Sequence, residues 1–580
     1  MNESSITQFN ESVKPRLAGI NAAPTSKKIS FFAAMLIVMG SSIGAGIFFK
    51  SQTVLDLSQS SLILAIFSWI VSAISVIAMG LALVEIGSAR NDNLSMIGWT
   101  KVFNSRMVFK ASKNFMFYVY APLTYFFMPL YALVSFQDGI GSFIHADASP
   151  LVIGTNADWA IWGLIAIFLS IYFIFVTGMS SRVGNMQNKI ITSVKFLPLA
   201  LVAIVGFVLA GILPNQTVDK VSSLVVNPPS FSVDVVQANG SKSSLSFLSS
   251  LANGASLQAF VPGLGLFLAV GAIFFAFDGF YITAGLQSEM REPKKTPYTI
   301  LVGLGITTLI YVILAVSMTI NGGSFYAMKE NMMRAFGHEG IPGRVLFGII
   351  SLGIAFGILG IINGSALWFP RFTEDLLKEG ELPFAIKYIN KLNPNCPKIG
   401  IRYTVSIYVP IAIVFTIIGG LGYIQSDSYA GYGIGLDRLY NFADLMATWT
   451  SVFAFSFIAA SIYGGLKNRK TKKIITDQKS YFKPMAIISV IIVTISMGIT
   501  IVMPILDMFL LSQVNPHERF YANGSSYLDI VVSRIVTVVV LLIYAFFTFL
   551  VSFLENVMNI KKFGSLEKYE AWQKEHFKVS

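Results

Sequence analysis

The chain has 580 residues, of which 54% are hydrophobic and only 12% are charged. Soluble domains usually carry about 25% charged residues, so this composition excludes a series of soluble domains and indicates a protein that crosses a membrane several times. The single cysteine, Cys396, excludes an intrachain disulfide, and the net charge of +12 by itself leaves nucleic-acid binding open.

Twelve segments are apolar over roughly the 20 residues that a helix needs to cross a bilayer. They lie at residues 29–55, 61–85, 115–143, 158–178, 190–213, 263–288, 298–321, 343–369, 401–424, 441–466, 484–510 and 528–556. The first segment is too long for the core of a signal peptide, so we interpret it as an uncleaved span. We therefore expect an all-α polytopic membrane protein with about 12 transmembrane helices.

The basic residues indicate which way the chain is oriented. Most of the 42 Lys and Arg residues lie in the two tails and in the loops on the same side as the tails. The opposite loops contain only Lys220, Lys242, Lys329, Arg334, Arg438 and Arg519. Because cytoplasmic loops are enriched in Lys and Arg, we expect both termini to be cytoplasmic in a multi-pass protein of the plasma membrane. The same distribution explains the net charge without a nucleic-acid partner.

The first span contains "GSSIGAG" at residues 40–46, with three glycines in the middle of an apolar segment. Glycine costs about 1 kcal/mol relative to alanine inside a helix, so the sequence predicts a break here. A broken helix at membrane depth must line an enclosed cavity, and the backbone N–H groups at the break are suited to bind a carboxylate. The alternative is close helix packing through Gly40 and Gly44, which form a small-xxx-small pair.

The sixth span contains a second interruption, Asp278 followed by Gly279. A charged residue at the centre of a bilayer costs roughly 3 kcal/mol, so it tends to face a cavity or a partner. Interruptions at corresponding positions of two halves are a pointer to the binding site of a transporter. Other charged residues, among them Glu85, Asp444 and Asp507, lie near the ends of spans and indicate less.

These motifs resemble those of the amino acid–polyamine–organocation (APC) superfamily. "MGSSIGAGIFF" is similar to its first span, "KFLPLALVAIVGF" to its fifth and "FFAFDGFYITAGLQSEMREPKKTPYTI" to its sixth. "NGSALWFPRFTEDLLKEGELPFAIKYINK" resembles its eighth span and the amphipathic segment that follows. The resemblance covers about residues 30–470. The chain departs from the pattern at Ser288, where an acid is usual, and in the long loop 214–262.

The resemblance implies a leucine-transporter-type fold with a 5+5 inverted repeat. The first repeat would comprise residues 29–213 after a tail at 1–28, and its first span would break at 40–46. The second repeat would comprise residues 263–466 after an extracellular loop at 214–262, and its sixth span would break near 275–281. A basic cytoplasmic loop at 467–483, two further spans within 484–556 and a cytoplasmic tail at 557–580 would complete the chain.

The resemblance also implies an amino acid site between the two breaks. The substrate carboxylate would meet the backbone N–H groups of Gly44, Ala45 and Gly46. The α-ammonium would meet carbonyl groups around Ser42 and Ile43, and around Phe275, Ala276 and Asp278. On the sixth span, the site would be formed by Phe275, Ala276, Phe277, Asp278 and Gly279, with Phe275 as an aromatic gate over the substrate.

Three interpretations of Asp278 remain open at this point. Its carboxylate would select a cationic substrate such as lysine, arginine or ornithine, or it would contact the α-ammonium or a coupling ion. In the third interpretation it is a helix-end acid that bonds to the local backbone.

Lys195, in the fifth span, also has two interpretations. Some members of the superfamily have a lysine near this position whose ammonium replaces a sodium ion, so that transport is coupled to protons. The alternative is a long side chain that extends to the membrane surface. The coupling ion is accordingly a proton or sodium.

The sequence thus predicts a secondary active amino acid transporter that works by alternating access. It carries no pattern of a nucleophile and base, a phosphate loop or a metal site, so we expect no enzyme activity and no cofactor. The alternatives are a cationic amino acid or polyamine exchanger, a membrane sensor that binds amino acids without moving them, and an ion channel. A polyamine has no carboxylate and would leave the N–H groups of the first break without an anion.

Overall fold

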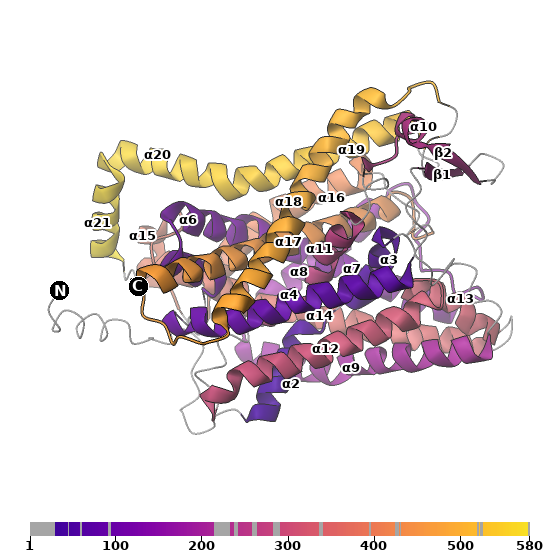
Figure 1. Cartoon of the computed structure of the whole chain (residues 1–580), viewed down its shortest axis with the longest axis horizontal. Helices are drawn as coiled ribbons and strands as arrows, with labels where there is room; N and C mark the ends of the chain where they lie inside the picture. Colours follow the sequence, from indigo (N-terminus) through magenta and orange to yellow (C-terminus); the bar gives the residue numbers. More distant parts are fainter. Residues whose placement is uncertain are drawn as a thin grey trace.

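The structure is a computed structural model and consists almost entirely of long helices (Figure 1). It describes residues 30–44, 46–58, 61–90, 94–213, 232–236, 242–257, 264–281, 291–335, 340–393, 396–423, 429, 431–518, 521 and 526–577.

The helices up to residue 212 form a first set. They are α2 (Phe31–Ser42), α3 (Gly46–Leu57), α4 (Leu62–Ala89), α5 (Met96–Phe103), α6 (Arg106–Asn114), the π-helix η1 (Phe115–Tyr120), α7 (Ala121–Ile144), α8 (Asp158–Met179) and α9 (Ser181–Ile212). The fifth span was expected from residue 190, but α9 already begins at Ser181, where the Ser180 hydroxyl accepts from the Val183 N–H.

A second set of helices follows the long loop. It comprises α11 (Leu264–Phe277), η4 (Pro293–Lys295), α12 (Thr296–Thr319), α13 (Phe325–Ala335), α14 (Ile341–Lys378), α15 (Ala385–Tyr388), η5 (Ile389–Lys391), α16 (Lys398–Ile417), η6 (Ile418–Gly422) and α17 (Leu436–Thr471). The remaining helices are α18 (Phe482–Phe509), η8 (Leu510–Gln513), α19 (Tyr527–Ala545), η10 (Phe546–Leu550), α20 (Val551–Phe563) and α21 (Leu566–His576).

Within the described residues, ten helical segments are long and apolar enough to cross a membrane, and two shorter apolar segments lie at Phe31–Gly40 and Leu264–Phe277. These short segments are where the first and sixth spans were expected, and both are short because the helix stops at a break. The ten long segments and the two interrupted ones account for the expected twelve spans.

The contacts between helices repeat across the two sets. Each of the first four spans contacts the span that lies five places later in the chain. Thus α3 packs against α11, α4 against α12, α7 against α14 and α8 against α16. Other contacts occur in matched pairs: α2 packs against α12 as α11 packs against α4, and α9 packs against α14 as α17 packs against α7. Because each set supplies an odd number of spans, five, the second set begins on the opposite side from the first. This is an inverted repeat.

The long loop between the two sets departs from the all-α expectation. Within the described part of this loop, strands β1 (Ser232–Val236) and β2 (Lys242–Ser246) form an antiparallel hairpin, followed by the short helix α10 (Phe247–Ala252). Arg534 of α19 donates to the carbonyl oxygens of Gly254 and Ala255, and Asp507 of α18 accepts from the hydroxyl of Ser256. The loop is thereby attached to the two additional spans.

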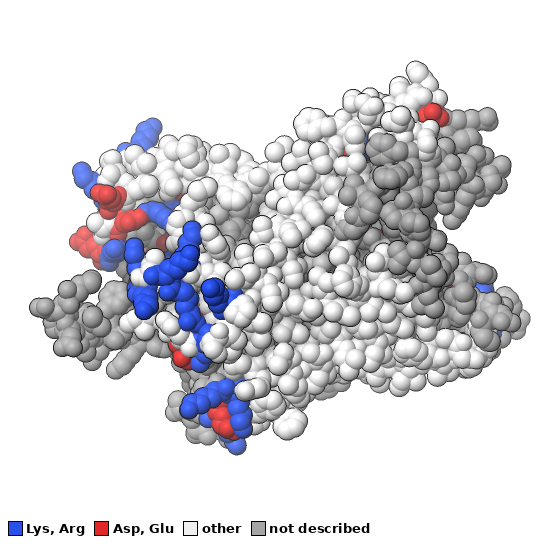
Figure 2. Space-filling view, viewed as in Figure 1, with Lys and Arg blue, Asp and Glu red and all other residues white. Residues whose placement is uncertain are grey.

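The C-terminal helix α21 lies at the opposite end of the molecule from the hairpin (Figure 1). This end of the chain packs on the protein: Phe577 covers Gly380, and the Gln573 side chain donates to the Glu379 carbonyl oxygen. Figure 2 shows that Lys and Arg side chains gather at this end.

Candidate functional site

The first break separates α2 from α3. Helix α2 ends at Ser42, Ile43 adopts an extended conformation with φ −79° and ψ 108°, and α3 begins at Gly46. The N–H groups of the first turn of α3 have no partner within their own helix, which suits them to bind an anion. Ala45, the middle residue of the expected N–H cluster, lies outside the described residues.

The second break follows α11. This helix ends at Phe277, and Gly279 adopts a φ of +99°, in the left-handed region that favours glycine. The last turn of α11 presents carbonyl oxygens that have no N–H partner in the helix. Phe280 and Tyr281 are described after the break, and the rest of the expected sixth span, residues 282–288, lies outside the described residues.

The two breaks contact each other through Gly46 and Ala276. A Cβ atom at Gly46 would lie 2.5 Å from the Ala276 Cα, so the backbones of α3 and α11 approach too closely for any side chain at this position. At Gly44 a Cβ would lie 3.2 Å from the end of the Ile361 side chain, and at Gly40 it would lie 3.7 Å from the Lys195 Nζ atom. Close approach of the two backbones therefore explains Gly46, and the Ile361 side chain of α14 leaves little space for a side chain at Gly44.

The carbonyl oxygens of Ser42 and Ala276 were both expected to face the substrate ammonium. In the structure they accept hydrogen bonds from one hydroxyl group, that of Tyr311 in α12. The Ser42 side chain is buried as well, and its hydroxyl has no hydrogen-bond partner among the described residues. The two helix ends thus converge on a small polar region inside an apolar bundle.

Phe275, the expected gate, is buried between aromatic side chains of the third span. Its ring centroid lies 5.7 Å from those of Phe127 and Tyr131, and the Lys50 ammonium lies 5.2 Å from the centre of the ring. The ring is therefore packed against α7 and lies close to a cation from α3, an arrangement that favours an ordered position. Phe277 is fully buried and contacts the Tyr311 ring edge to face.

The Lys50 ammonium forms an ion pair with Asp444 of α17 at 2.6 Å. It also donates to the Asp444 carbonyl oxygen and to the Thr448 hydroxyl, and the Tyr131 hydroxyl donates to the same carboxylate. Lys50 is 0% exposed. Sequence reasoning did not identify this pair, because Asp444 was placed near a span end; the only signal was a lysine directly after the apolar "GIFF" of the first span.

The Asp278 carboxylate is bonded on both of its oxygens. Oδ2 accepts from the hydroxyl of Tyr120, the last residue of η1, at 2.7 Å, and Oδ1 accepts from the Gly279 N–H at 2.9 Å. The Tyr120 hydroxyl also lies 3.3 Å from that of Tyr281. This geometry matches the interpretation of Asp278 as a helix-end acid bonded to the local backbone, with an added partner from the third span.

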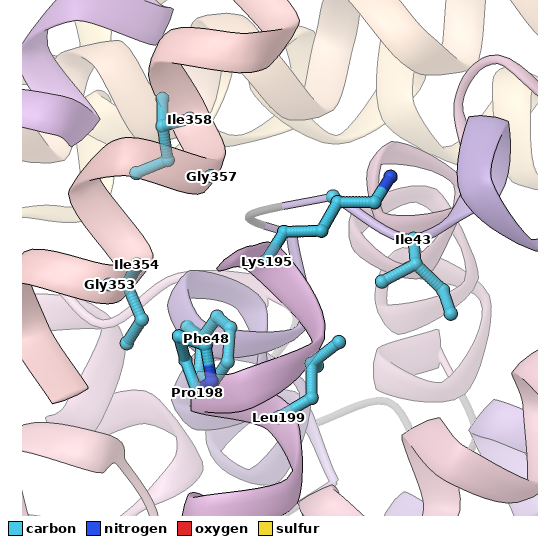
Figure 3. A pocket seen from close by; sticks show the side chains of 10 residues that line it. Ile43, Phe48, Lys195, Pro198, Leu199, Gly353, Ile354, Gly357 and Ile358 are labelled. Atoms are coloured by element: carbon cyan, nitrogen blue, oxygen red, sulfur yellow. The ribbon is translucent and has the colours of Figure 1, made fainter. Parts of the chain in front are cut away.

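Lys195 reaches the first break from α9. Its ammonium donates to the Gly40 carbonyl oxygen at 2.6 Å, and no carboxylate of the described residues pairs with it. A small pocket with about 310 Å³ of empty space, its open part included, lies between α9, α14 and the break. Figure 3 shows Lys195 extending past the non-helical segment that carries Ile43. The pocket is lined by Ile43, Gly44, Phe48, Lys195, Pro198, Leu199, Gly353, Ile354, Gly357 and Ile358.

Comparison with protein families places most of the chain in one of them. The family model described as "Amino acid permease" matches residues 29–513. A protein of Mycoplasma pneumoniae is 46% identical over 562 residues, which are 95% of this chain and 98% of that protein.

Two characterised relatives are more distant. The serine/threonine exchanger SteT of Bacillus subtilis is 24% identical over 398 residues, which are 67% of this chain and 77% of that protein. The human b(0,+)-type amino acid transporter 1 is 21% identical over 377 residues, which are 63% of this chain and 65% of that protein.

Proposed function

Since the chain belongs to the amino acid permease family, it is a multi-pass membrane transporter of amino acids and not an enzyme, and we propose that it is a secondary active transporter whose substrate binds between the breaks after α2 and α11. The contact between Gly46 and Ala276 carries this proposal, because it brings the two interruptions of the membrane helices to one place. Binding at this midplane site would alternate between the two sides of the membrane.

The polarity of the helix ends supports an amino acid as the ligand. The N-terminal end of a helix carries a partial positive charge and the C-terminal end a partial negative charge. Here α3 begins, and α2 and α11 end, within one region. The carboxylate of a zwitterion would meet the N–H groups of residues 44–46, and its ammonium would meet carbonyl oxygens such as those of Ile43 and Phe275.

We infer further that the substrate is a neutral amino acid. The carboxylates of Asp278 and Asp444 are the acids of the described residues that lie against the breaks, and each already has partners: Tyr120 and Gly279 for the first, Lys50 and Tyr131 for the second. A cationic side chain would have to displace one of these partners.

The surroundings of Lys195 in the pocket support proton coupling through this residue. An ammonium that has no carboxylate partner among the described residues, and that is held by a carbonyl oxygen of α2, changes its attraction to that helix when it loses its proton. The protonation of Lys195 would thus bias the position of α2 relative to α9. Sodium as the coupling ion is the alternative, and ion replacement in a transport assay separates the two.

We infer the orientation of the chain from its basic end. Because the basic side chains gather where α21 lies (Figure 2), we place this end in the cytoplasm and the hairpin of β1 and β2 outside the cell. In this orientation both termini would be cytoplasmic, and we propose the plasma membrane as the membrane that the chain crosses. Proteolysis of intact and permeabilised cells, followed by detection of tags at the two termini, tests the orientation.

Transport into proteoliposomes tests the proposed function and separates it from its rivals. The purified protein is expected to take up a labelled neutral amino acid with saturation, to be inhibited by a small group of amino acids and to show no ionic conductance. Binding without uptake would identify a sensor, uptake of putrescine alone would identify a polyamine exchanger, and conductance without saturation would identify a channel.

A thermal-shift screen of the twenty amino acids with ornithine and putrescine identifies the substrate to use. A ligand that binds only the folded protein stabilises it by about 2.7 kcal/mol at a hundred times its Kd. A neutral amino acid is expected to give the largest shift. A larger shift with lysine, arginine or ornithine would contradict the neutral class and leave amino acid transport itself untouched.

A further inference from the structure

The hydroxyl of Tyr311 connects the two broken helices. It lies 2.8 Å from the Ser42 carbonyl oxygen at the end of α2 and 2.7 Å from the Ala276 carbonyl oxygen near the end of α11. Carbonyl groups in the last turn of a helix have no N–H partner within that helix. A residue of a third helix, α12, therefore satisfies one such carbonyl from each break.

The Tyr311 ring is fixed by its neighbours. It is fully buried, with the Trp69 ring of α4 at 5.5 Å and the Phe277 ring of α11 at 5.1 Å, measured between centroids. A ring held on two sides has little freedom to turn, so the position of its hydroxyl is set by packing. The breaks are consequently located by a rigid side chain and not only by their own backbone.

A tyrosine hydroxyl has one proton to donate. With two acceptors within 2.8 Å, that proton is shared between Ser42 and Ala276, and both oxygens must stay close to the hydroxyl to use it. If α2 and α11 moved apart, one buried carbonyl would lose its partner. The shared bond therefore favours movement of the two helix ends together.

We propose that Tyr311 is a positioning residue that holds the carbonyl ends of α2 and α11 in one arrangement, so that the neighbouring groups of the breaks are presented to the substrate together. The inference rests on the proposed site between the breaks and refines it. The Ser42 and Ala276 carbonyls hold the two helix ends in place through Tyr311. The substrate ammonium binds carbonyls beside them, such as those of Ile43 and Phe275.

The test is Tyr311→Phe, which keeps the ring with its contacts to Trp69 and Phe277 and removes only the hydroxyl. Uptake in proteoliposomes is expected to show a KM raised about tenfold with kcat within about twofold, because the groups that receive the substrate are no longer prearranged. The thermal shift produced by a fixed substrate concentration is expected to shrink accordingly.

Tyr544→Phe is the matched control. Tyr544 is also fully buried, and its hydroxyl lies 2.9 Å from that of Thr450, between α19 and α17. Its loss removes a buried hydrogen bond away from the breaks and is expected to lower the melting temperature while leaving KM unchanged. An unchanged KM in Tyr311→Phe, or an equal rise in Tyr544→Phe, would overturn the proposal.

Trp69→Phe provides a second variant in case Tyr311→Phe does not fold. It weakens the packing against the Tyr311 ring and keeps the Tyr311 hydroxyl. It is expected to raise KM about threefold. An unchanged KM in this folded variant would also overturn the proposal. Failure of the proposed function is distinguishable, since the wild-type protein would then show no saturable uptake of any amino acid.

Discussion

The Lys50 ammonium and the Asp444 carboxylate lie 2.6 Å apart, although 394 residues separate them in the chain. The pair joins α3, directly after the first break, to α17, and the lysine also lies over the ring of Phe275. An ion pair is therefore built into the wall of the proposed substrate site. Its charges cancel, which leaves the site suited to a zwitterion with an uncharged side chain.

We predict that Lys50→Met destabilises the protein by about 3 kcal/mol, because removing one partner of a buried pair leaves an unpaired buried charge. The double variant Lys50→Met with Asp444→Asn is expected to recover most of that loss, since the asparagine still accepts from Tyr131. The free energy of unfolding in detergent measures both. If the losses in the free energy of unfolding of the two single variants simply added in the double variant, the two charges would not interact.

The exposed pair of Lys295 and Glu292 serves as a control for this cycle. Its side chains are 50% and 62% exposed, so Glu292→Gln is expected to change the free energy of unfolding by less than about 0.5 kcal/mol. A similar loss in both experiments would mean that the buried location of the Lys50 pair is irrelevant.

Gly46→Ala is predicted to destabilise the protein by about 1 to 3 kcal/mol and to abolish uptake, because its methyl group would lie 2.5 Å from the Ala276 Cα and 2.9 Å from the Ala276 N and Cβ atoms. Gly305→Ala in α12 is the control, since nothing lies within 4 Å of its added Cβ. That variant is expected to be neutral or slightly more stable. Unfolding and uptake are measured in parallel, and normal uptake by Gly46→Ala would refute the close contact.

Lys195→Ala is predicted to uncouple uptake from a pH gradient. The wild-type protein is expected to accumulate substrate when the outside is acidic, and the variant to exchange substrate without accumulation. Replacing sodium by choline is expected to change neither. A pH response that survives in Lys195→Ala would exclude the lysine as the coupling group, and dependence of the wild type on sodium would identify the other ion.

Asp278→Asn is predicted to keep the binding of neutral amino acids within about twofold, which corresponds to roughly 0.4 kcal/mol. The amide oxygen can still accept from Tyr120 or from the Gly279 N–H, so the turn after α11 should persist. Isothermal titration with the best ligand of the thermal-shift screen measures the change. Loss of every amino acid would instead indicate that Asp278 contacts the α-ammonium.

Much of the fold was predictable because each span and each break depends on the residues of its own segment. Long apolar runs fix the spans, and glycines in "GSSIGAG" together with Asp278 and Gly279 fix the breaks, since both features act through the backbone of their own segment. The β1–β2 hairpin was not predicted, although "FSVDV" at residues 231–235 alternates apolar and polar residues and the turn pair "NG" follows at residues 239–240. The early start of α9 was also missed, since its first turns are polar.

The partners in the site were less predictable than the breaks. Tyr311 was one of 22 tyrosines, in an apolar span without a motif, and only the packing of α12 against α2 brings it to both breaks. Asp444 and Lys50 are likewise joined by the arrangement of two distant helices. Single-sequence patterns report which segments are helical and where they break, but they do not report which side chains meet across helices.

The most direct test of a substrate site between the breaks is protection of a cysteine at the first break. In a Cys396→Ser background, which removes the only native cysteine, Ile43→Cys places a thiol in the pocket at the break and Asn156→Cys places one on an exposed loop. Reaction of a small thiol reagent at position 43 is predicted to block uptake. The transported amino acid at ten times its Kd is predicted to slow that reaction about tenfold and to leave the reaction at position 156 unchanged. An equal rate at position 43 with and without the amino acid would contradict the account.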